Sequence, residues 1–213
     1  MTKGSGVFAE WIGGLADPDP GVRKTAALRL YLAGGTLCSR ALNDWLSDPE
    51  FHALALPKAA GANSDSGMRK VAYTVGIAVE PDDFERILAA NGSPKLSDVP
   101  PDQDAREFEL TFDGSRHFDI LTTREPGGSG PIARYLQKFG AGIQQIEVNV
   151  TDVDRASEIL LARFSLAPIY PASRPGADGT RVNFFLVPSR NGGKVLIELV
   201  EAAEKQKGET KHA

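Results

Sequence analysis

The feature that most constrains the fold is an internal repeat in the later part of the chain. Residues 74–79, TVGIAV, match residues 145–150, QIEVNV, and each is followed by a segment whose apolar residues have helical spacing. Residues 107–110 match 183–186, and residues 118–121 match 197–200. A strand, a helix and three further strands, present twice, predict an α+β fold in which paired βαβββ modules form one curved mixed sheet around a cleft.

Several of the predicted strands carry polar residues on one face only. In residues 142–150, GIQQIEVNV, the polar side chains Gln145, Glu147 and Asn149 alternate with apolar ones. If the apolar face packs on helices, the polar face lines the cleft. In two other predicted strands, Glu109 lies on the same face as Glu107, and His117 lies on the same face as Asp119. A sheet face in contact with solvent is the simpler alternative for each of them.

The sequence pattern of residues 1–57 predicts a small helical domain. Asp19 and Pro20 are typical of the N-cap and first position of a helix, and the pair Gly34-Gly35 predicts its end. A third helix is expected after this pair and a short fourth one after Pro49. The pattern DPDPGVRKTAALRL resembles one unit of the HEAT-type helical repeats, which need about three units for stability. We therefore expect these helices to pack on the next domain or on a protein partner.

The remaining domain boundaries follow from local composition. Residues 58–67, KAAGANSDSG, are small and polar, which is typical of a linker. Residues 68–201 contain the repeated modules. The charged segment 202–213 is expected to be a disordered tail.

Overall composition argues against several classes of function. The net charge is −4, with 24 Lys and Arg against 28 Asp and Glu, so we expect no nucleic-acid surface. No apolar run approaches the roughly 18 residues of a membrane span, and the N-terminus lacks the apolar core of a signal peptide. The one cysteine, Cys38, forms no internal disulfide and is expected to be a buried helix residue. These features predict a cytoplasmic protein.

Three stretches resemble the vicinal oxygen chelate superfamily, which includes glyoxalase I, extradiol dioxygenases and fosfomycin-resistance proteins. They are VGIAV at 75–79, GSGPIARYLQKFGAGIQQIEVNVTDVDRA at 128–156 and RPGADGTRVNFFLVPSRNGGKVLIELVE at 174–201. Their order and spacing are most similar to those of the methylmalonyl-CoA epimerases. The resemblance implies a glyoxalase-like domain with a ligand in the cleft, either a small molecule or an acyl-CoA-like substrate.

The resemblance also implies a divalent metal at the floor of the cleft, held by one side chain from each of four strands. The matching positions here are Thr74, Asp119, Gln145 and Glu198. Two of these positions are histidines in the epimerases, and Thr74 and Gln145 stand in their place. Oxygen ligands alone favour a hard cation such as Mg²⁺, Mn²⁺ or Ca²⁺ over Zn²⁺ or Co²⁺. We therefore expect either a weakly held hard cation or a cleft without metal, and Thr74 also suits a strand without any such role.

For catalysis, the resemblance points to Glu107, which matches a cleft glutamate of the epimerases, and to Glu198. Glu109 shares the face of Glu107 and is its rival. Carboxylates that converge without a cation repel one another, so we expect the pKa of at least one of them to be raised. His117 is a candidate base or ligand, although a lone strand histidine is more often structural. Arg174 is a candidate contact for a CoA-like phosphate.

Three classes of function compete. The first is an enzyme, an isomerase of the epimerase type or a lyase, that acts on a small acyl or carbonyl substrate by proton transfer. The second is a protein that binds a small molecule without turnover, and the third is an interaction protein that uses its N-terminal helices. The replaced histidines weigh against the usual epimerase mechanism, and the retained Glu198 weighs against a purely scaffolding role. The sequence leaves open whether the modules pair within one chain or across a homodimer.

Overall fold

The structure is a computed structural model that describes residues 5–55, 73–189 and 193–203. The predicted linker at 58–67 lies outside the described residues, as does the predicted tail from residue 204 onward. None of the described helices is long and apolar enough to cross a membrane.

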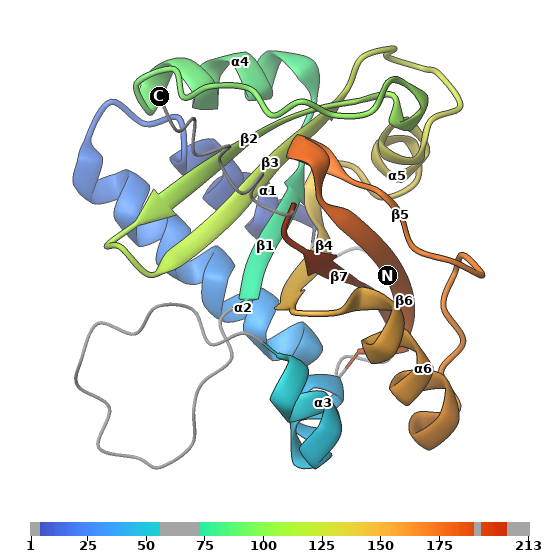
Figure 1. Ribbon diagram of the computed structural model, residues 1–213. Coiled ribbons are helices and arrows are strands. Elements are labelled where there is room, and N and C mark those ends of the chain that lie inside the picture. Colours follow the sequence, from blue (N-terminus) through green and yellow to red (C-terminus); the bar gives the residue numbers. More distant parts are fainter. Residues whose placement is uncertain (1–4, 56–72, 190–192, 204–213) are drawn as a thin grey trace, which may run out of the picture.

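A curved mixed sheet of seven strands forms the centre of the described part of the chain (Figure 1). Its strands are β1 (Tyr73–Ala78), β2 (Ala105–Phe112), β3 (Arg116–Thr123), β4 (Gly142–Val150), β5 (Arg174–Pro175), β6 (Arg181–Pro188) and β7 (Lys194–Glu201). They lie in the order β2-β3-β1-β4-β7-β6-β5. The pairs β1–β3 and β4–β7 are parallel, whereas β1–β4, β2–β3, β6–β7 and β5–β6 are antiparallel. This sheet confirms the predicted α+β fold.

The two modules are not identical. The second has the predicted order, with β4, then α6 (Val153–Phe164), then β5, β6 and β7. The first has β1 and α4 (Pro81–Ala90), followed by only two assigned strands, β2 and β3, so the prediction of three strands there is wrong. In place of the missing strand, an extended segment runs beside β2, and Ser97 N donates to Glu107 O at 2.9 Å. Pro94, Pro100 and Pro101 flank this segment and lack the N–H groups that a longer ladder needs.

Three N-terminal helices precede the sheet: α1 (Ser5–Gly14), α2 (Pro20–Ser47) and α3 (Pro49–Leu54). The predicted start of α2 is confirmed, because the Asp19 side chain accepts a hydrogen bond from Gly21 N at 2.7 Å and Pro20 is the first helical residue. The short helix expected after Pro49 is confirmed as α3. The helix end predicted at Gly34-Gly35 is wrong, since α2 continues through the pair to Ser47.

Close packing explains why α2 contains two glycines without ending there. A Cβ atom on Gly34 would lie 2.7 Å from Val75 Cγ2, and one on Gly35 would lie 2.2 Å from Tyr73 Oη. Both values are far below a normal contact distance, so only glycine lets the helix lie directly on β1. The tyrosine hydroxyl is held in place, as it donates to Tyr31 O at 3.0 Å, and the rings of Tyr31 and Tyr73 stack at 4.4 Å.

The convex face of the sheet is covered by α1, α2, α4 and α6 (Figure 1). Their buried side chains form one core with the apolar face of the strands, including the fully buried Leu30 and Phe51 from the N-terminal helices. Burial of one such side chain stabilises the fold by about 1.5–3 kcal/mol. The N-terminal helices therefore pack on the sheet, as expected. The fifth long helix, α5 (Pro131–Phe139), packs instead on Ala78 and Leu121 at one end of the concave face.

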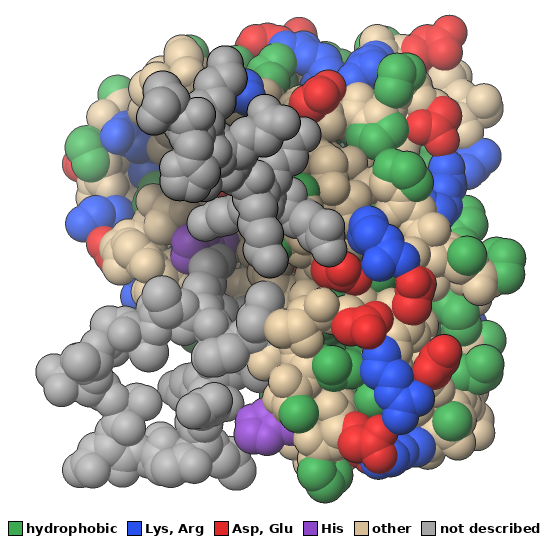
Figure 2. Space-filling view, in the orientation of Figure 1, with side chains coloured by type: hydrophobic (Ala, Val, Ile, Leu, Met, Phe, Trp, Pro, Cys, Tyr) green, Lys and Arg blue, Asp and Glu red, His purple; other side chains and the backbone are tan. Residues whose placement is uncertain are grey.

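Ion pairs also connect the N-terminal helices to the second module. Arg163 on α6 pairs with Asp48 and Glu50, and Arg155 pairs with Glu50 at 2.7 Å. Figure 2 shows acidic and basic side chains interspersed over this part of the surface. Because most of these groups are exposed, each pair contributes only about 0–1 kcal/mol. The apolar core, rather than these ion pairs, holds the helices on the sheet.

Candidate functional site

The concave face of the sheet contains a cavity of about 570 Å³. Two short 3₁₀ helices, Pro101–Gln103 and Ala177–Gly179, contribute to its rim, together with α5. All nine side chains that the sequence places in the cleft line this cavity: Thr74, Glu107, Glu109, His117, Asp119, Gln145, Glu147, Asn149 and Glu198. The strand alternation thus brings them together, and their chemical roles stay predictions.

Strand register orders the floor of the cavity into two rows. In one row Asp119 on β3 lies opposite Gly76 on β1, and Gly76 lies opposite Gln145 on β4. In the next row Thr74 on β1 lies opposite Glu147, and Glu147 lies opposite Glu198 on β7. A Cβ atom on Gly76 would lie 2.5 Å from Gln145 Cγ. The glycine therefore allows the Gln145 side chain to lie across the floor between the carboxyl groups.

The deepest carboxyl groups interact with one another. Asp119 is 3% exposed and Glu198 is 7% exposed, and both form side-chain hydrogen bonds with Glu147. Gln145 Nε2 donates a further hydrogen bond to Glu198 Oε2. Burial raises the pKa of Asp119 and of Glu198 well above the ordinary value, and the charge of Glu147 raises both further. Both groups therefore release their protons less readily than ordinary carboxyl groups do.

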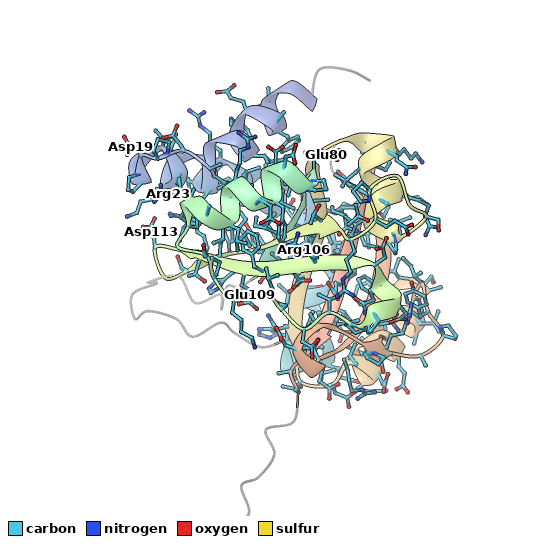
Figure 3. The ribbon with its side chains drawn as sticks, turned by 90° about the horizontal axis from the view of Figure 1, so that it is seen from above. Asp19, Arg23, Glu80, Arg106, Glu109 and Asp113 are labelled. Atoms are coloured by element: carbon cyan, nitrogen blue, oxygen red, sulfur yellow. The ribbon has the colours of Figure 1, made fainter. Side chains whose placement is uncertain are left out.

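Glu107 projects into the same cavity from β2. Burial raises its pKa to about 8, and the nearby charges of Glu147, Glu109 and Asp178 act in the same direction. A carboxyl group with a pKa near neutrality both accepts and releases protons at working pH, which its ordinary pKa would not allow. Glu109, two residues along, is exposed at the rim, and Figure 3 shows it on the other side of β2 from Arg106, which faces α4. Burial thus distinguishes Glu107 from the rival that the sequence could not separate from it.

The rim also carries cations and aromatic rings. Arg174 pairs with Asp102 at 2.7 Å and lies 4.5 Å from the centre of the Tyr170 ring. Arg134 on α5 lines the cavity and is exposed. His117 Nδ1 lies 3.1 Å from Thr111 Oγ1. The sequence did not single out Arg134 or Tyr170, because neither belongs to an alternating strand.

The four predicted metal positions do not fit a metal ion as they are arranged. Gln145 directs a donor, its amide nitrogen, at the Glu198 oxygen that would have to be a ligand. Within residues 5–55, 73–189 and 193–203, no three Asp, Glu, His or Cys side chains surround a common point as ligands would. The chemistry considered below therefore uses the side chains alone.

Comparison with known proteins identifies relatives among solved structures. No family model matches the sequence, and no curated protein matches it. The methylmalonyl-CoA epimerase of Mycobacterium tuberculosis is 31% identical, with a TM-score of 0.51 over 68% of this chain and 96% of that one. A methylmalonyl-CoA epimerase in complex with methylmalonyl-CoA and NH4+ is 25% identical, with a TM-score of 0.50 over 62% and 93% of the two chains.

A variant of the Streptomyces coelicolor methylmalonyl-CoA epimerase, in complex with 2-nitronate-propionyl-CoA, gives the same identity of 25% and TM-score of 0.50, over 62% and 93% of the chains. These likenesses extend over almost the whole length of the relatives and agree with the two-module curved sheet and its cavity. The chain therefore belongs to the vicinal oxygen chelate superfamily, in the family of the methylmalonyl-CoA epimerases.

Proposed function

We propose that this protein binds a small acyl or carbonyl compound in the concave cavity and transfers the proton on the carbon next to the carbonyl group. The observation that carries the proposal is Glu107, a carboxyl group that faces the cavity and whose pKa is raised to about 8. Membership of the epimerase family supports an acyl thioester as the first substrate class to test.

The proposed reaction moves one proton off the substrate and one proton back. The Glu107 carboxylate takes the proton from the α-carbon, and the electron pair of that C–H bond moves into the carbonyl group to form an enolate. Glu198, across the sheet on β7, returns a proton to the same carbon, and the electron pair returns with it. Delivery to the opposite face inverts the carbon, which is epimerisation. Gln145, which donates to Glu198, holds that carboxyl group in place.

Solvent exchange tests the proposal directly. The full-length protein is incubated with methylmalonyl-CoA or propionyl-CoA in D₂O, and the α-proton signal is followed by NMR. We expect the wild type to exchange the α-proton, so that its signal is lost. The rate of loss should be at least about 10²-fold lower with Glu107→Gln. It should equal the wild-type rate with Glu10→Gln, which changes an exposed glutamate on α1. Equal rates for the wild type and Glu107→Gln would rule out Glu107 as the proton carrier.

Binding without turnover is the second candidate function. It is favoured by the hydrogen bond that Gln145 donates to Glu198, because Gln145 stands where the family resemblance implies a metal-binding histidine. In the same spectra this function appears as saturable shifts of the ligand signals with the α-proton retained. A lyase would instead produce new carbon-bearing products. A protein partner is not needed to cover the apolar side of α2, because the sheet covers it.

A further inference from the structure

A β-bulge adds one more polar side chain to the cavity. The β1–β4 pairing moves from Gly76 opposite Gln145 to Ile77 opposite Ile143, so Gln144 is an extra residue on β4. Gln144 and Gln145 consequently both line the cavity, although they are neighbours in sequence. Strict alternation would have directed Gln144 to the other face of the sheet.

Two oxygen atoms in this cavity are buried without a hydrogen-bond partner. They are Asp119 Oδ2 and Gln144 Oε1, and within the described residues no other buried side-chain nitrogen or oxygen lacks a partner. Asp119 is 97% buried, given its exposed fraction of 3%. Such atoms are rare in folded proteins, because leaving them unpaired is unfavourable. The amide oxygen of Gln144 is an acceptor. Asp119 Oδ2 is also an acceptor, because a proton on this carboxyl group would lie on the other oxygen, which is bonded to Glu147. The missing partner is therefore a donor.

The charges around these two oxygens specify the donor further. Glu109, Glu147 and Asp178, whose charges act on Glu107, line the same cavity. The cations lie at its rim, where Arg174 is already paired with Asp102 and Arg134 is exposed on α5. A positively charged donor at the floor would therefore be attracted by several carboxyl groups, whereas a carboxylate or phosphate there would be repelled.

We propose that the compound bound in this cavity carries a protonated nitrogen, an alkylammonium or amidinium group, whose N–H groups bond to Asp119 Oδ2 and Gln144 Oε1. The remainder of the ligand packs on the apolar part of the lining, including Leu196, Tyr170 and Phe184. A cavity of about 570 Å³ has room for such a body beyond the nitrogen itself. The inference rests on the proposed role of the cavity as the ligand site, and names the class of substrate, but it does not require turnover.

Three probes of equal chain length test this proposal: pentylammonium, pentan-1-ol and pentanoate. Binding of each to the full-length protein is measured by NMR titration at pH 7.5 and constant ionic strength. We expect saturable binding of pentylammonium, at least about tenfold tighter than that of the alcohol, because an ionised donor forms the stronger hydrogen bond. Pentanoate is expected to bind more weakly than the alcohol.

Variants of the two acceptors provide the matched controls. Asp119→Asn and Gln144→Leu are each expected to weaken pentylammonium binding about tenfold, and Gln144→Glu is expected to tighten it. Glu10→Gln, which changes an exposed residue that does not line the cavity, should leave pentylammonium binding unchanged. Since Asp119 is deeply buried, Gln144→Leu and Gln144→Glu carry the test if Asp119→Asn does not fold. Thermal melting of each variant checks that it is folded.

The outcomes separate this inference from the proposed catalysis. Selective pentylammonium binding that depends on Gln144 supports the inference even if no α-proton exchange is found with any acyl thioester. Equal binding of amine and alcohol, or amine binding unaffected by the Gln144 variants, overturns it. Proton exchange on acyl thioesters without any preference for the amine also overturns it, while the proposed proton transfer stands.

Discussion

Replacing Glu107 by glutamine is expected to make the stability of the protein less sensitive to pH. The pKa of Glu107 is raised from its ordinary value of 4.5 to about 8, mainly by burial and then by the charges of Glu147, Glu109 and Asp178. Between these two values the folded protein keeps a proton that the unfolded chain releases, so the free energy of unfolding falls as the pH rises. Below pH 4.5 both states hold the proton, and above about pH 8 both have lost it.

The size of the effect follows from the shift in pKa. Each pH unit between the two values changes the free energy of unfolding by about 1.4 kcal/mol. From pH 5.5 to pH 8, Glu107 is therefore expected to lower the stability of the wild type by on the order of 3 kcal/mol. Glutamine does not ionise, so the free energy of unfolding of Glu107→Gln should rise relative to that of the wild type by the same amount over this pH range.

Urea unfolding at several pH values and constant ionic strength measures this difference. Glu10→Gln, an exposed substitution on α1, serves as the control and is expected to follow the wild type at every pH. Parallel pH profiles for the wild type and Glu107→Gln would refute the reasoning, because they would mean that Glu107 ionises in the folded protein as it does in the unfolded chain.

Three further predictions concern packing and metal binding. Gly35→Ala is expected to destabilise the protein by about 1–3 kcal/mol, because the added methyl group would lie 2.2 Å from the hydroxyl oxygen of Tyr73. Gly13→Ala, with open space around it, should instead stabilise α1 by about 0.5–1 kcal/mol. Thermal melting compares the two variants. Leu30→Ala, at 0% exposure, is expected to cost about 2–5 kcal/mol in urea unfolding, and Leu32→Ala, at 58%, less than about 0.5 kcal/mol. After incubation with Mg²⁺, Mn²⁺ or Ca²⁺ and desalting, elemental analysis should find well below one ion per chain, because Gln145 directs its amide nitrogen at Glu198. One ion per chain would instead show that Gln145 turns its amide oxygen into the cavity.

Much of the architecture and of the cavity lining was predictable, because both depend on short-range periodicity. Polar and apolar residues alternate along β2 and β4, and similar strand segments recur in both modules. The alternation placed Gln145 on the polar face of its strand, and the resemblance to the epimerases placed Glu107, Asp119 and Glu198 at the cleft. Periodicity could not rank Glu107 above Glu109, since the difference between them is burial by segments far away in the sequence.

The sequence by itself thus determined the two-module sheet, the N-cap of α2 and most of the polar side chains that face the cleft, because these follow from local patterns. Tertiary structure decided the rest. The glycines of α2 do not end the helix, because its backbone gains close contact with β1 at Gly34 and Gly35. Gln144 enters the cavity only because the pairing of β4 with β1 shifts by one residue. The raised pKa of the deepest carboxyl groups depends on distances between strands and on exclusion of water, which a linear sequence does not contain.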